Sequence, residues 1–199
     1  MERLIRLSDR FSTWAAWVGG GILFATAIMI AIEVVLRKLF AISMGGADEL
    51  SNYALAISSS WTFGYALFRK AHIRIDVFYV RLPQRVRQAL DVLSLALFGF
   101  CTLVVSYFAF RVLWTSIQRS SIANTPLATP LWIPQGLWFA GILTLTLMIF
   151  ILLAGTLYRL WAGDASGAQS LSGASTIKEE IEEEAAPAEL RTTGGGGVP

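Results

Sequence analysis

The residues of this chain that could do chemistry are few, and they lie far apart. There is one histidine, His72, and one cysteine, Cys101, which lies inside an apolar stretch. A metal site needs several ligands at a recognisable spacing, and a nucleophilic serine needs a base and an orienting acid beside it. Neither pattern occurs, and no glycine-rich phosphate loop follows a strand. The sequence therefore predicts a protein that is not an enzyme, with no cofactor and no metal site.

Glu33 is the acidic residue placed most deeply in an apolar stretch. Arg37 follows four residues later, at the spacing that brings two side chains together on one helix face. Ionisable groups inside a membrane are expensive and indicate function by default. Two interpretations are open: Glu33 and Arg37 form a structural intramembrane ion pair, or Glu33 is the coupling residue of a small exporter.

The elements that position these residues are predicted to be transmembrane helices. Hydrophobic residues make up 55% of the 199 positions and charged residues only 15%, against about 25% charged in soluble domains. A bilayer core needs roughly 20 apolar residues as helix, and four segments qualify: residues 14–36, 50–68, 90–114 and 136–157. We predict an all-α integral membrane protein with four transmembrane helices, of which the second is the most polar.

Basic residues predict the orientation of these spans. They gather before the first span and between the second and third, at Arg3, Arg6, Arg10, Arg69, Lys70, Arg74, Arg81, Arg85 and Arg87. The positive-inside rule places both termini and the middle loop in the cytoplasm, as in a multi-pass protein of the bacterial inner membrane. The net charge of +2 and the lack of a basic patch with interleaved aromatic residues argue against a nucleic-acid partner.

Residues 14–161 are the predicted membrane part, and one segment flanks it on each side. In residues 1–13, apolar side chains recur at helical spacing, at Leu4, Leu7 and Phe11, continuing to Trp14. This amphipathic segment either lies on the membrane lipids or simply extends the first span. Residues 162–199 contain an acidic run from Lys178 to Glu184, and we predict a disordered cytoplasmic tail.

Small residues recur every four positions along the second span, at Asn52, Ala56, Ser60 and Gly64. Such ladders let transmembrane helices approach closely. This helix-packing face serves either the other helices of this chain or a second subunit.

Several motifs together resemble a known family. They are Ala66 to Phe78 (ALFRKAHIRIDVF), Asp48-Glu49 before the second span, Leu82-Pro83 with Arg87 to Asp91 before the third, and Thr129 to Gln135 (TPLWIPQ) before the fourth. Over roughly residues 10–160 the chain resembles the small, DctQ-like membrane subunit of tripartite ATP-independent periplasmic (TRAP) transporters.

The resemblance implies a function and partners. The small subunit would pair with a large, elevator-type membrane subunit that carries the substrate and sodium sites, while a periplasmic binding protein delivers an organic acid. This chain would enlarge the static scaffold and bind no substrate. Carried over residue by residue, the resemblance implies a docking or structural motif at Arg69, His72, Arg74, Asp76 and Pro83, and positioning elements near the outer surface at Trp132 and Pro134.

The sequence leaves two other functions open. A self-sufficient homodimeric exporter would use Glu33 as its intramembrane acid, although Glu33 is off-centre and Arg37 is near. A membrane assembly protein without a transport role would leave uptake intact when its gene is deleted.

The docking interpretation predicts that Arg74→Ala with Asp76→Ala weakens association with the large subunit without unfolding this chain. The removed side chains are the ion-pair or hydrogen-bonding anchors of the motif. Co-purification with the partner is the measurement, and a double variant that recovers the partner as well as the parent contradicts the docking role.

Overall fold

The structure is a computed structural model, and it describes residues 2–70, 82–164, 167–168 and 171. Four helices account for most of them: α1 (Glu2–Phe40), α2 (Ala47–Phe68), α4 (Gln84–Gln118) and α5 (Trp132–Trp161). The described residues contain no extended strand, only one isolated bridge between Ile122 and Pro130. The predicted all-helical class is confirmed, and each predicted span lies within one of these helices.

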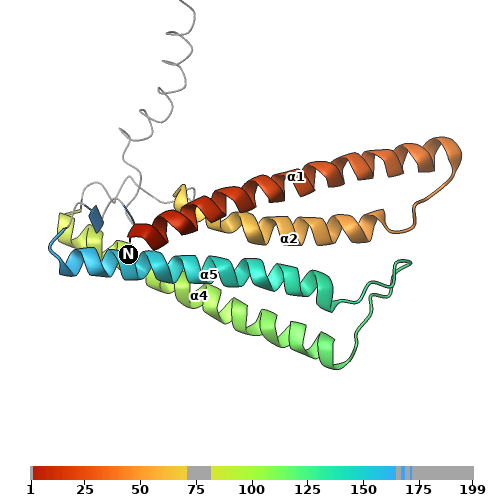
Figure 1. The fold of residues 1–199 in the computed structure, drawn as a ribbon. Helices are drawn as coiled ribbons and strands as arrows, with labels where there is room; N and C mark the ends of the chain where they lie inside the picture. The colour runs from red at the N-terminus through yellow and green to blue at the C-terminus, as the bar shows by residue number, and fades with distance from the viewer. Residues whose placement is uncertain (1, 71–81, 165–166, 169–170, 172–199) are drawn as a thin grey trace, which may run out of the picture.

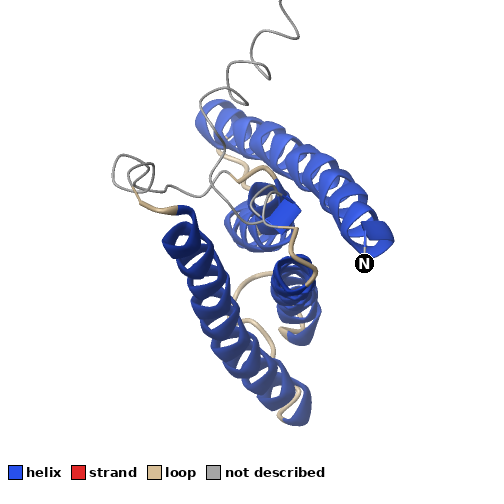
Figure 2. Ribbon diagram, turned by 90° about the vertical axis from the view of Figure 1, so that its left-hand side faces the viewer, coloured by secondary structure: helices blue, strands red, loops and turns tan. Residues whose placement is uncertain are grey.

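The four helices stand side by side in a row, in the order α1, α2, α5, α4. The main contacts run from α1 to α2, from α2 to α5 and from α5 to α4, and α1 also touches α5. Figure 2, which looks approximately along the helices, shows α2 and α5 in the middle with α1 and α4 on the outside. The buried apolar cluster comes from α2, α4 and α5, at Leu67, Leu95, Leu145, Met148, Ile149 and Leu152.

The two ends of the row differ. At one end, here called the termini end, lie the start of α1, the end of α2, the start of α4 and the end of α5 (Figure 1). There Arg159 of α5 forms an ion pair with Glu2 of α1, with 3.3 Å between nitrogen and oxygen. The other end holds the turn 41–46 and the connection 119–131, and it is here called the arm end after that connection. Toward the arm end, the α1–α2 pair separates from the α4–α5 pair (Figure 1).

Helix α1 is a single helix of 39 residues, about 58 Å long at 1.5 Å per residue. It passes without a break through the predicted boundary between residues 13 and 14. Of the two arrangements left open by the sequence, the structure has the simple helical extension. Leu4 and Leu7 remain exposed on it.

Three of the helices in the described part of the chain, α1, α4 and α5, are long and apolar enough to cross a membrane. Helix α2 falls below that standard because of its hydroxyl side chains. These hydroxyls are largely satisfied inside the helix: Ser60 Oγ donates to the carbonyl of Ile57 at 2.8 Å, and Thr62 Oγ1 donates to that of Ser58 at 3.0 Å.

The chain beyond α5 continues to touch the membrane part. The backbone N–H of Gly167 donates to Asp164 at 2.9 Å, Ala168 is buried, and Leu171 packs against the apolar cluster. The acidic run from Lys178 to Glu184 lies outside the described residues, so its disorder stays a prediction.

A reporter fused after Gln118 tests whether α2 is a span. With a cytoplasmic N-terminus and four crossings, Gln118 is extracytoplasmic; if α2 does not cross, the same residue is cytoplasmic. Periplasmic activity of an alkaline-phosphatase fusion, without activity of the matching cytoplasmic reporter, is the expected result. The opposite pattern rejects the four-span topology.

Candidate functional site

The predicted docking motif lies at the termini end, where α2 stops and α4 starts. Arg69 closes α2, its N–H donating to the carbonyl of Tyr65 at 3.0 Å, and its guanidinium carbon lies 5.2 Å from the centre of the Tyr65 ring. Pro83 caps α4 from an extended backbone conformation, and its carbonyl accepts the N–H groups of Val86 and Arg87. His72, Arg74 and Asp76 lie outside the described residues, so the role of the motif stays a prediction.

The small-residue face of α2 packs against α5 along the half of α2 that is nearer the termini end. A Cβ atom added at Gly141 of α5 would lie 2.9 Å from Ser60 Cβ, and one added at Gly64 would lie 2.7 Å from the sulfur of Met148. Ser60 and Gly64 are buried. These two positions of the predicted face therefore serve this chain's own packing.

The same face is free farther along the helix. Asn52 and Ala56 are exposed because the α4–α5 pair diverges from α2 toward the arm end. Ser58 and Thr62, on the adjacent side of α2, face α1 instead. A Cβ added at Gly19 of α1 would lie 3.0 Å from Thr62 and 3.3 Å from the carbonyl oxygen of Ser58.

Two polar contacts join helices inside the row. The indole N–H of Trp61 on α2 donates to the carbonyl of Leu137 on α5 at 2.9 Å. The hydroxyls of Ser106 on α4 and Thr146 on α5 share a hydrogen bond of 2.9 Å. The sequence gives no local sign of either pair, because their members are 76 and 40 residues apart.

Glu33 is bound to the turn that follows α1. Its carboxylate accepts the hydroxyl of Ser43 at 2.7 Å and the backbone N–H of Met44 at 2.8 Å, and the residue is only 6% exposed. Arg37, the predicted partner, is exposed, and its charge also acts on the Glu33 carboxylate. The i, i+4 spacing identified a neighbour on the helix, but the turn folds back and brings better-placed donors to the carboxylate.

Trp132 and Pro134 begin α5 at the arm end. Pro134 is buried in the first turn, where its missing N–H leaves no hydrogen bond unmade. Trp132 is half exposed, as an aromatic residue at a membrane interface is.

The segment before α5 forms an arm, residues 121–131, that the sequence did not predict. It is a short hairpin: Ala123 N–H donates to the carbonyl of Thr129 at 2.9 Å and Leu131 N–H to that of Ser121 at 3.0 Å. The turn closes with Ala128 N–H donating to Thr125 at 3.0 Å. The arm contains two prolines, Pro126 and Pro130, and proline disfavours regular helix.

Glu49, in the first turn of α2, lies beneath this arm. The residue is 8% exposed; its Oε1 atom accepts the Tyr53 hydroxyl at 2.8 Å, and its Oε2 atom is buried without a well-formed hydrogen bond to any described residue. The nearby Thr125 hydroxyl holds the pKa of the Glu49 carboxyl below its usual value, helped by Thr129 and Tyr53 and opposed by burial. Glu49 is therefore a buried acid with hydroxyl neighbours, and the sequence had indicated it only as part of an acidic pair before the second span.

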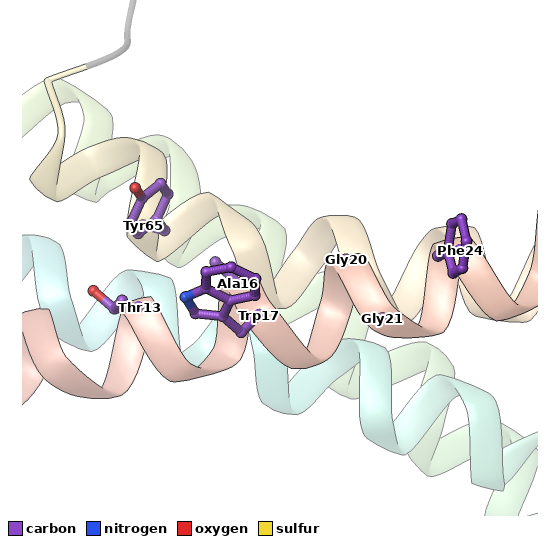
Figure 3. Close-up of a pocket in the computed structure, with 7 residues that line it drawn as sticks. All are labelled: Thr13, Ala16, Trp17, Gly20, Gly21, Phe24 and Tyr65. Carbon is purple, nitrogen blue, oxygen red and sulfur yellow. The ribbon is translucent and has the colours of Figure 1, made fainter. Parts of the chain in front are cut away.

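A groove of about 530 Å³ runs along α1 beside α2 (Figure 3). Gly20 and Gly21 line it, and a Cβ atom added at either glycine would meet no atom within 4 Å. Trp17 and Phe24, which also line it, are exposed. Its full lining is Thr13, Ala16, Trp17, Gly20, Gly21, Phe24 and Tyr65.

Long apolar helices joined by small-residue contacts define an α-helical membrane protein. Residues 26–163 match the family described as tripartite ATP-independent periplasmic transporters, DctQ component. The chain therefore belongs to the DctQ family and is the small component of a TRAP transporter. No curated protein and no solved structure gave a significant match.

The contact between α2 and α5 predicts a difference between two glycines. Gly141→Ala places a methyl group against Ser60 and Trp61 and is expected to cost about 1–3 kcal/mol, as overpacking does. Gly20→Ala meets open space and is the matched control. Thermal denaturation in detergent is the measurement, and equal midpoints for both variants contradict close α2–α5 packing.

Proposed function

We propose that this chain is the small scaffold subunit of a sodium-coupled TRAP transporter in the bacterial inner membrane, which imports an organic acid delivered by a periplasmic binding protein. The chain itself binds no substrate. It pairs with a large multi-span membrane subunit and holds that subunit's static part in the bilayer. The match to the DctQ family over residues 26–163 carries this proposal.

The proposed topology has four crossings, with the termini end in the cytoplasm. Basic residues concentrate at that end, where Arg3, Arg6, Arg10, Arg69, Lys70, Arg85 and Arg87 lie near the helix ends. Helix α2 has 22 residues, about 33 Å of helix and enough for a bilayer core about 30 Å thick. Its place between α1 and α5 supports a crossing, because its hydroxyls then face neighbouring helices rather than lipid.

The row arrangement supports a scaffold role. A single layer of helices leaves two broad sides, and large apolar side chains cover much of both outer helices; examples are Phe24 on α1 and Phe100 on α4. One such side is available for the large subunit while the other meets lipid.

The exporter alternative would require Glu33 to load and release an ion. In the structure both Glu33 oxygens are hydrogen-bonded to the turn 43–44 near the end of the helix. This geometry favours a structural role for Glu33 over a coupling role.

Gentle detergent extraction followed by affinity purification tests the proposal. We expect a large multi-span membrane protein in a one-to-one ratio, and sodium-dependent uptake in reconstituted vesicles only when both membrane subunits and the binding protein are present. A stable homo-oligomer that purifies without a partner, and whose export activity disappears in Glu33→Gln, contradicts it. Uptake that survives deletion of this chain also contradicts it.

A further inference from the structure

Helix packing does not join the two helix pairs to each other at the arm end. Helices α2 and α5 make their close contacts at Ser60 and Gly64, in the half of α2 nearer the termini end. Asn52 and Ala56, the next members of the same face toward the arm end, are exposed, and the two helix pairs have separated there (Figure 1). Some other contact must fix the distance between the pairs at this end.

The arm crosses this gap and touches the α1–α2 pair. It leaves α4, turns at residues 125–128 and returns to α5. Pro126 lies 3.9 Å from the Cβ position of Gly45, and the side chain of Leu127 covers Gly46 so closely that an added Cβ would lie 2.5 Å from Leu127 Cγ. The arm is therefore seated on the turn that joins α1 to α2.

A buried carboxylate lies under the seated arm. Tyr53 satisfies one oxygen of Glu49 from within α2, and the other oxygen lacks a well-formed partner in the described part of the chain. The hydroxyls of Thr125 and Thr129, both on the arm, are the side chains that interact with this carboxylate from across the gap. A carboxyl group that is only 8% exposed is costly to bury unless such donors remain beside it, so its burial ties the arm to α2.

We propose that Glu49 is a positioning residue that fastens the arm across the gap between the two helix pairs. The arm and Glu49 together form a clasp, and this clasp, rather than helix packing, sets the spacing of the pairs at the arm end. The inference concerns this chain alone and stands whether or not the proposed transport function is correct.

Disulfide trapping in native membranes tests the clasp. The full chain carries Cys101→Ser together with Gly46→Cys and Leu127→Cys; Leu127 Cβ is one bond from the Cγ atom that lies 2.5 Å from the Gly46 Cβ position, which suits the Cβ–Cβ separation of about 3.5–4.5 Å in disulfides. We expect rapid oxidation with Glu49 present and a rate about tenfold lower in Glu49→Ala, the low end of the range for contacts between polar donors and a charged group. Asp48→Ala, an exposed acid one residue earlier, is the matched control and keeps the parent rate.

Spin labels give a second, independent readout. Nitroxides at Leu39→Cys on α1 and Ile117→Cys on α4, both exposed, report the distance between the pairs at the arm end in the Cys101→Ser chain. The distribution is expected to be narrow in the parent and in Asp48→Ala, and broad in Thr125→Val with Thr129→Val, which removes the hydroxyls at nearly constant shape. A distribution that is equally narrow in that double variant, or equal trapping rates with and without Glu49, overturns the proposal.

Discussion

The close approach of α2 to α5 is the contact on which the rest of the structure depends. A glycine on one helix faces a serine on the other, at Gly141 and Ser60, with no room for a further carbon atom. Because lipid tails are as apolar as the side chains, transmembrane helices associate through such close packing and not through burial from water. This contact joins an α1–α2 pair to an α4–α5 pair and makes one row of four helices.

Polar groups follow the same logic. Inside the row, Trp61, Ser106 and Thr146 are hydrogen-bonded to a neighbouring helix, whereas Ser60 and Thr62 donate to carbonyls of α2 itself. Two buried acids lie toward the arm end: Glu33 accepts the Ser43 hydroxyl and the Met44 N–H from the turn after α1, and Glu49 accepts the Tyr53 hydroxyl from within α2. Helix packing therefore determines the row, and Glu33 fixes the turn that follows α1.

The sequence predicted what depends on composition and local spacing. About 20 apolar residues are needed to cross a bilayer, so the four helices and their approximate centres could be found, and a repeat of small residues identified the packing face of α2. The sequence did not show that α5 covers only half of that face, because the divergence of the two helix pairs depends on packing along the whole chain. The spacing of Glu33 and Arg37 along one helix could not show that Ser43 and Met44 return to Glu33 through a turn and donate hydrogen bonds to it. The seating of the arm over Glu49 joins residues more than 70 positions apart and has no local signal.

The row of helices also has a hydrodynamic consequence. A flat plate of helices standing upright in a bilayer has a wide outline for its mass, and the drag that lipid exerts on a rotating body rises with the square of that width. When such a plate lies with one broad side against another membrane protein, it widens the outline of the assembly and slows its rotation about the membrane normal.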